Sequence, residues 1–202
     1  MSIRAVIFDM GGVLVRTEDR TPRLRLAERL GLTYNELSAL IFDSPSAHQA
    51  MKGEITAPEH WEAIQEALGV AQDELVKMKL DFWGGDTLDE NLVNYLRDLR
   101  PQYKTALLSN AWDDLRQMLE GEWKIDDAFD EIIISAEIGL VKPDPRIYQR
   151  VIADLDVVPA EAVFVDDFPE NVAGASLQGL HGIHFNDSDQ ALRDLSHLLE
   201  TN

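Results

Sequence analysis

Five short apolar runs, separated by helical patterns, constrain the fold of this chain more than any other feature. Their apolar residues follow one another without alternation, as in strands that are buried on both faces. The runs are Arg4–Phe8, Thr105–Ser109, Ile132–Ser135, Ala162–Val165 and Gly182–Phe185. Helical patterns such as Leu88–Leu99 and Ile147–Leu155 lie between them. This alternation predicts an α/β protein with a doubly wound, mostly parallel sheet.

One stretch of about seventy residues, from Arg16 to Gly85, interrupts the alternation with helices alone. Thr33 and Thr56 each stand three residues before a glutamate, which is the capping-box signal for the start of a helix. The stretch returns through Gly84 and Gly85, which we interpret as a hinge. We therefore expect an all-helical cap at residues 16–85, inserted into an α/β catalytic core made of residues 1–15 and 86–202.

Composition excludes several classes of function. The chain of 202 residues has 18 basic and 37 acidic side chains and a formal charge of -19. That balance argues against a surface for nucleic acid or an anionic membrane, since both attract clustered Lys and Arg. The absence of cysteine excludes disulfides, thiolate metal sites and cysteine nucleophiles. The first apolar run is too short for a signal or membrane segment, so we expect a cytoplasmic protein.

Polar side chains follow the predicted strands at the points where those strands end. Asp9 follows the first run and precedes a turn at Gly11 and Gly12, and Ser109 ends the second run. The carboxyl ends of parallel strands share one edge of the sheet, where α/β proteins place their ligands. The Asp9 carboxylate can act there as a nucleophile. Ser109, with backbone N–H groups from a helix starting near Trp112, can cradle an oxyanion or phosphate.

Two later segments add charge to the same edge. Lys142 lies between a strand and a helix opened by proline, and Pro143 and Pro145 just after it make its loop rigid. Asp166 and Asp167 directly follow a buried strand. Adjacent buried carboxylates repel one another unless a cation lies between them. Three carboxylates and one ammonium leave a charge of about -2, which one Mg²⁺ balances with the oxygen ligands that it prefers. The sequence therefore predicts a magnesium and phosphate site.

The four segments resemble the four motifs of the haloacid dehalogenase superfamily of hydrolases, in order and spacing. They are Phe8–Val13, Leu108–Asn110, Lys142–Asp144 and Val165–Asp167. The helical insertion is similar to the cap of one subgroup, and the third and fourth motifs are most similar to sugar-phosphate phosphatases and the phosphatase domain of soluble epoxide hydrolases. The resemblance implies a Rossmann-like fold and a phosphatase that acts on a small phosphorylated metabolite.

The resemblance also implies a role for each matching residue. Asp9 is the nucleophile that forms an aspartyl-phosphate, and Lys142 holds it and neutralises the phosphate. Ser109 and the N–H of Asn110 bind phosphate. The expected Mg²⁺ ligands are Asp9, the backbone carbonyl of Gly11 and Asp167, with Asp166 bound directly or through water. Asn171 is expected to support the water molecules on the metal.

Gly11 departs from the family pattern, in which a second Asp at this position protonates the leaving alcohol. Three interpretations remain open: a phosphatase that works without this group, a 2-haloacid dehalogenase, whose halide needs no proton, and a non-catalytic protein that binds Mg²⁺ and a phosphorylated ligand. A substitute proton donor could come from His48, Glu54 or His60. Candidate specificity residues of the cap are Arg16, His48, Lys52, Trp61 and Trp83.

Overall fold

A parallel sheet forms the centre of the computed structural model, which describes residues 2–201. Within those residues the sheet has five strands in the order β5-β4-β1-β6-β7. The strands are β1 (Ala5–Phe8), β4 (Lys104–Ser109), β5 (Glu131–Ile134), β6 (Ala162–Asp166) and β7 (His181–His184). Each agrees with a predicted strand to within one residue at either end. The doubly wound, mostly parallel α/β prediction is confirmed.

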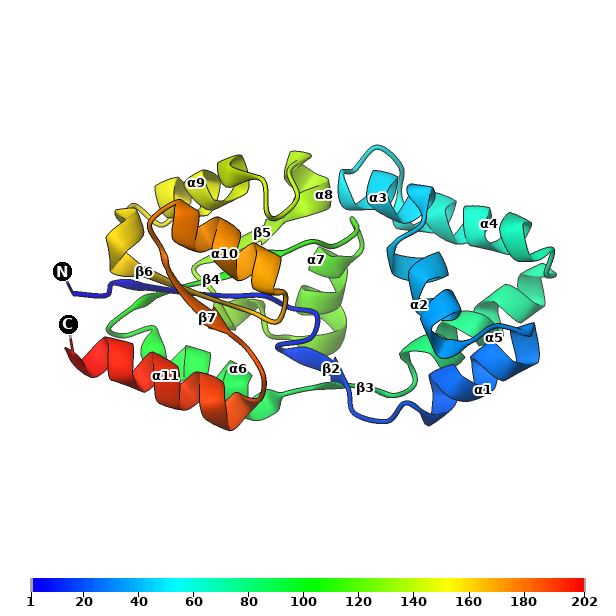
Figure 1. Cartoon of the computed structure of the whole chain (residues 1–202), viewed down its shortest axis with the longest axis horizontal. Helices are drawn as coiled ribbons and strands as arrows, with labels where there is room; N and C mark the ends of the chain where they lie inside the picture. The colour runs from blue at the N-terminus through cyan, green and yellow to red at the C-terminus, as the bar shows by residue number, and fades with distance from the viewer. Residues whose placement is uncertain (1, 202) are drawn as a thin grey trace.

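Helices cover both faces of the sheet (Figure 1). They are α6 (Glu90–Leu99) and α11 (Ser188–Thr201) on one face, and α9 (Pro145–Asp154) and α10 (Pro169–Leu177) on the other. Successive side chains of β1 point to opposite faces of the sheet. Val6 and Phe8 pack with α6 and α11, and Ala5 and Ile7 pack with α9. Because a strand points alternate side chains to opposite faces, an unbroken apolar run is what a covered central strand requires.

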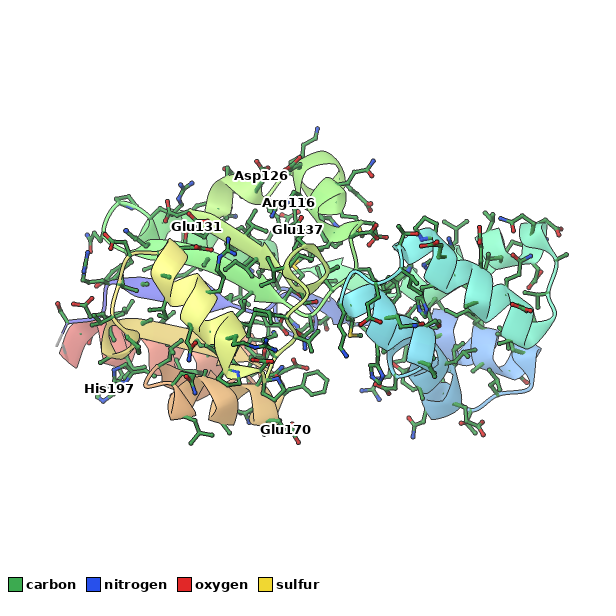
Figure 2. The ribbon with its side chains drawn as sticks, turned by 90° about the horizontal axis from the view of Figure 1, so that it is seen from above. Arg116, Asp126, Glu131, Glu137, Glu170 and His197 are labelled. Carbon is green, nitrogen blue, oxygen red and sulfur yellow. The ribbon has the colours of Figure 1, made fainter. Side chains whose placement is uncertain are left out.

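The segment between β1 and α6 is helical, as predicted, and lies beyond the carboxyl ends of the strands (Figures 1 and 2). Its helices are α1 (Thr21–Leu30), α2 (Tyr34–Phe42), α3 (Pro45–Met51), α4 (Ala57–Leu68) and α5 (Gln72–Trp83). Both capping boxes form, at Thr33 and Thr56. The helices share an apolar core that also includes Trp112 of the α/β part. Their division from the α/β part as a separate cap domain stays a prediction.

The chain enters and leaves the helical insertion through a two-stranded ribbon that the sequence did not indicate. Val15–Thr17 (β2) pairs antiparallel with Asp86–Leu88 (β3). The prediction of helices alone was therefore wrong at its edges, because strands of three residues are too short to show periodicity. Helix α3 was also not predicted, although the Ser44 side chain caps its N-terminus by accepting a hydrogen bond from the N–H of Ala47.

A buried ion pair ties the first inserted helix to this ribbon. Arg23 of α1 donates from Nη2 to both carboxylate oxygens of Asp86, at 2.9 and 2.7 Å, and from Nε to the carbonyl of Phe82. Its guanidinium also lies over the Phe82 ring, 4.1 Å from the centroid. The bidentate geometry fixes the orientation of α1 relative to β3.

Within the described residues, no helix combines the length and the apolar character needed to span a bilayer.

We expect Arg23→Ala to lower the free energy of unfolding by about 3–5 kcal/mol, because it leaves the Asp86 carboxylate largely buried without its partner. Urea denaturation measures this loss. Arg25→Ala, on an exposed position of the same helix, serves as the control and should change stability by about 0.5 kcal/mol or less. Equal effects of the two substitutions would show that the ion pair does not anchor the insertion.

Candidate active site

The structure brings the charged residues predicted from the sequence to one edge of the sheet. Asp9 directly follows β1, Ser109 ends β4, Asp166 ends β6 and Asp167 follows it. Oxygen atoms of Asp9, Asp166 and Asp167 lie within 4.8 Å of one another. The parallel register explains the convergence, because β1 pairs with both β4 and β6, and its last residue, Phe8, lies opposite Leu107 and Val165, each within two residues of the end of its strand.

Lys142 reaches the site by a longer route than predicted. A short helix, α8 (Ser135–Ile138), and a loop separate it from β5. Asn110 holds this loop against the sheet edge: its Oδ1 accepts from the Lys142 N–H at 2.7 Å and its Nδ2 donates to the Lys142 carbonyl at 3.0 Å. The Asn110 side chain therefore positions Lys142, a role that nothing in the sequence indicated, and its backbone N–H is the group left for an anion.

The Lys142 ammonium lies between two carboxylates and is buried. Its Nζ is 2.8 Å from Asp9 Oδ1 and 2.7 Å from Asp166 Oδ2, and it donates to the carbonyl of Leu108 at 2.9 Å. The contact with Asp9 is an ion pair whose direction is poor for a hydrogen bond, so Asp9 Oδ1 has no hydrogen-bond partner. An ammonium has three N–H groups, and two of them are committed to Leu108 and Asp166.

Asp166 has a different role from its neighbour Asp167. Asp166 is fully buried, and its oxygens accept from Lys142, from the backbone N–H of Phe168 and from Asn171 Nδ2 at 3.0 and 3.1 Å. Tyr148, buried beneath, donates its hydroxyl to the Asn171 carbonyl at 2.8 Å and so fixes that residue. Asp166 is thus held by protein groups, and Asn171 contacts it directly, which sequence reasoning missed.

Asp167 has an oxygen that no protein group satisfies. Its Oδ1 is buried without a hydrogen-bond partner, as is Oδ1 of Asp9. A buried carboxylate oxygen is costly to leave unpaired. Asp9 Oδ1 already faces the Lys142 ammonium, so the unsatisfied oxygen of Asp167, with the rest of the Asp9 carboxylate beside it, forms a donor set that fits a divalent cation such as Mg²⁺.

Burial and repulsion act on the acidity of these two groups. Desolvation raises the pKa of Asp9 to about 6, with Lys142 opposing the rise and Asp166 adding to it. Desolvation, followed by the charges of Asp9 and Asp166, raises the pKa of Asp167 to about 7. A cation beside these groups would favour their ionised forms.

The two glycines after Asp9 meet different surroundings. Gly12 has a φ of +77°, and a Cβ there would lie 2.1 Å from Asp167 Oδ2, so only glycine lets this turn approach Asp167. At Gly11 a Cβ would meet no atom within 4 Å, and the backbone is not left-handed. The missing side chain at position 11 is therefore not imposed by lack of space.

The phosphate cradle near Ser109 differs from the prediction. The helix expected near Trp112 begins only at Leu115, as α7 (Leu115–Gln117), and continues as a π-helix at Met118–Trp123. The N–H of Ala111 already donates to Ser135 Oγ at 3.0 Å. An anion at this edge would therefore meet the Ser109 hydroxyl and the Asn110 N–H in a loop, without a helix terminus.

A cavity of about 1090 Å³ extends from this edge to the helical insertion. Its wall includes Asp9, Gly11, Ser109, Asn110, Lys142, Asp167 and Asn171. It also includes the five specificity candidates named from the sequence, Arg16, His48, Lys52, Trp61 and Trp83. Of the three candidate proton donors, His48 lines the cavity. His60 is instead buried inside the insertion, where its ring nitrogens contact Ser46 Oγ and the carbonyl of Ile41.

The raised pKa values have a consequence for stability when no divalent cation is present. Between about pH 4 and 7 the folded protein holds protons on Asp9 and Asp167 that the unfolded chain releases, so these groups destabilise the fold as pH rises. We expect Asp167→Asn to stabilise the protein relative to wild type by about 1–2 kcal/mol more at pH 8 than at pH 4, after allowance for solvent screening. Urea denaturation in EDTA at both pH values tests this, and a difference that does not change with pH would contradict the assigned shift.

Comparison with known proteins agrees with this geometry. A family model described as haloacid dehalogenase-like hydrolase matches residues 3–179. A sesquiterpene phosphatase of Aspergillus oryzae is 30% identical over 98% of this chain and 97% of its own length. Bifunctional epoxide hydrolase 2 of Sus scrofa is 30% identical over 96% of the chain, which spans 38% of that longer protein. An (S)-2-haloacid dehalogenase of Pseudomonas is 28% identical over 91% of the chain and 85% of its own length.

Solved structures show the same fold. A mutant form of a haloacid dehalogenase family enzyme from Bacteroides thetaiotaomicron, in complex with magnesium and inorganic phosphate, superposes with a TM-score of 0.75 at 25% identity, covering 93% of this chain and 96% of that one. A family hydrolase from Porphyromonas gingivalis superposes with a TM-score of 0.79 at 23% identity, covering 98% of each chain. The matched residues include the whole charged edge of the sheet, and the chain belongs to the haloacid dehalogenase-like hydrolases.

Proposed function

We propose that the protein is a Mg²⁺-dependent phosphatase that hydrolyses a small phosphate ester through an aspartyl-phosphate on Asp9. The observation that carries the proposal is a group of three carboxylates, two of which contact one buried ammonium, while a buried oxygen of the third, Asp167, has no partner. This arrangement has an excess of negative charge that a cation and its oxygen ligands resolve. The relatives named as phosphatases, and the related enzyme crystallised with magnesium and phosphate, support it.

Each residue then has a chemical task. The Asp9 carboxylate attacks phosphorus, the bond from phosphorus to the ester oxygen breaks, and that oxygen keeps the electron pair and takes a proton from water to leave as the alcohol. The Ser109 hydroxyl and the Asn110 N–H bind phosphate oxygens, and the Lys142 charge keeps Asp9 oriented and offsets the phosphate's charge. Water then attacks the phosphorus of the aspartyl-phosphate, which releases phosphate and restores Asp9.

Asp9, Asp167 and the carbonyl of Gly11 would hold the Mg²⁺, and Asp166 and Asn171 would support it. When bound, the ion neutralises charge on the phosphate oxygens.

Two alternatives explain fewer of the observations. Carbon–halogen hydrolysis suits Gly11, and a haloacid dehalogenase is among the relatives. That reaction needs no cation, however, and gives no reason for Asp167 to be buried against Asp9. A non-catalytic ligand-binding protein suits Gly11 equally well, but it does not require a nucleophile held against a buried ammonium.

The first test is phosphate release from p-nitrophenyl phosphate. We expect turnover with Mg²⁺, its loss with EDTA, and a fall of more than about 10³-fold in Asp9→Asn because the nucleophile is removed. Asp98→Asn, an exposed carboxylate on α6, should retain wild-type activity as the matched control. Chloride release from a 2-haloacid, without phosphatase activity, would favour the dehalogenase instead.

The second test concerns the proton donor that Gly11 lacks. We expect aryl and acyl phosphates, whose leaving groups need little protonation, to be hydrolysed faster than alkyl phosphates. Gly11→Asp should raise kcat for an alkyl phosphate by about 10²-fold or more, since a Cβ at this position meets no atom within 4 Å. Gly11→Asn has a similar shape without an ionisable group and should stay near wild type. Equal slowness on both ester classes would count against the account.

A further inference from the structure

All four tryptophans of the chain, each within the described residues, line the cavity that opens onto Asp9. They come from separate segments: Trp61 from α4, Trp83 from the end of α5, Trp112 from the loop after β4, and Trp123 from the end of the π-helix. Trp112 makes edge-on contacts with Trp61 and Trp83, at centroid distances of 6.0 and 6.4 Å. Tryptophans from both the insertion and the α/β part therefore converge on one space.

One phenylalanine and two methionines line the cavity beside the tryptophans. Phe42 stacks on Trp112 at 6.4 Å, and Met51 and Met118 also line the cavity. Methionine adapts to irregular apolar groups. The helical turn that carries Met118 is fixed from outside, because Arg116 pairs with Glu137 at 2.6 Å (Figure 2). This ion pair therefore holds in place the helical turn that brings Met118 to the cavity.

Two arginines on the wall are engaged with the protein. Arg23 is paired with Asp86, and Arg16 donates to Asp89 at 2.9 Å, to Glu18 at 3.0 Å and to the carbonyl of Val13. These guanidinium groups are committed to the ribbon that joins the two parts of the molecule.

The volume of the cavity is also large enough for a substrate with a bulky apolar group. Pockets for drug-sized ligands measure about 300–1,000 Å³, and this cavity has about 1090 Å³. One end holds the carboxylates and Lys142. The four tryptophans, Phe42 and the methionines line much of the remainder, together with polar side chains such as Arg20, His48 and Lys52. A ligand that matches the whole space has a phosphate at one end and a long apolar group at the other.

We propose that the substrate is a phosphate ester of a long-chain or ring-containing apolar alcohol, whose carbon skeleton lies among Trp61, Trp83, Trp112 and Trp123. The inference rests on the proposed phosphatase function and specifies its substrate class. Burial of the skeleton between the insertion and the α/β part gives binding energy that a sugar phosphate cannot supply.

A homologous series of n-alkyl phosphates tests this with the wild-type protein and Mg²⁺. From butyl through hexyl and octyl to decyl phosphate, below micelle-forming concentrations, we expect kcat/KM to rise by up to about fourfold for each buried methylene. Glucose 6-phosphate should be a poorer substrate than decyl phosphate. A series that stays flat or falls, in a preparation that shows Asp9-dependent turnover of p-nitrophenyl phosphate, overturns the substrate class while leaving the phosphatase function intact.

Two substitutions on helix α5 test where the carbon skeleton of the substrate lies. Trp83→Ala should flatten the rise in kcat/KM from butyl to decyl phosphate, mainly by raising KM for the longer esters. Leu80→Ala removes an exposed apolar side chain, 69% accessible, from the same helix outside the cavity and should leave the rise unchanged. Equal effects of the two substitutions would contradict the placement.

Binding can be measured without turnover in Asp9→Asn, because every tryptophan reports on the cavity. Decyl phosphate should change the tryptophan fluorescence with a Kd at least about tenfold below that for butyl phosphate. Equal Kd values would overturn the proposal even if Trp83→Ala fails to fold. Failure of p-nitrophenyl phosphate turnover together with tight decyl phosphate binding would refute the phosphatase reaction but keep the ligand class.

Discussion

The buried ammonium of Lys142 is the charge on which the rest of the site depends. Asp9 and Asp166 lie on adjacent strands of one sheet and would repel each other without it. One backbone carbonyl, from Leu108, completes its contacts and ties it to the strand on the other side of β1. Since breaking a buried ion pair is more costly than never forming one, this single lysine fixes the relative positions of strand ends that are far apart in sequence.

The sheet and the convergence of its strand ends could be predicted because they follow from local patterns. Buried strands appear as unbroken apolar runs, and parallel strands bring their final residues together. The contacts made by Asn110 and Asn171 could not be predicted, since they depend on how a loop from one part of the chain meets another. The same limit hid the ribbon at Val15–Thr17 and shifted the helix expected near Trp112. Pairing and packing in three dimensions determine such features, and residue spacing along the chain carries no signal of them.

Gly11 and the tryptophan-lined cavity bear on two separate properties of a substrate, namely the reactivity of its leaving group and the shape of its carbon skeleton. Under the proposed function, Gly11 leaves the site without a group to protonate the leaving oxygen, so the rate would depend more on the leaving group itself. The cavity selects by shape and apolar area, and its walls come from both the insertion and the α/β part. Under the two proposals, the sheet edge supplies the nucleophile and the charge, while the insertion and the α/β part together supply the surface that contacts the apolar group of the substrate.

The central claim is that Asp9 becomes phosphorylated during turnover. A residue that activates water in the second step would also be missing at Gly11, so the aspartyl-phosphate should persist longer than in a protein that has one. Rapid mixing with p-nitrophenyl phosphate and Mg²⁺, followed by acid quenching and mass spectrometry of peptides, tests this directly. The account predicts one phosphoryl group on the peptide that contains Asp9. Steady turnover without any phosphorylated peptide, or with the group on another residue, would contradict it.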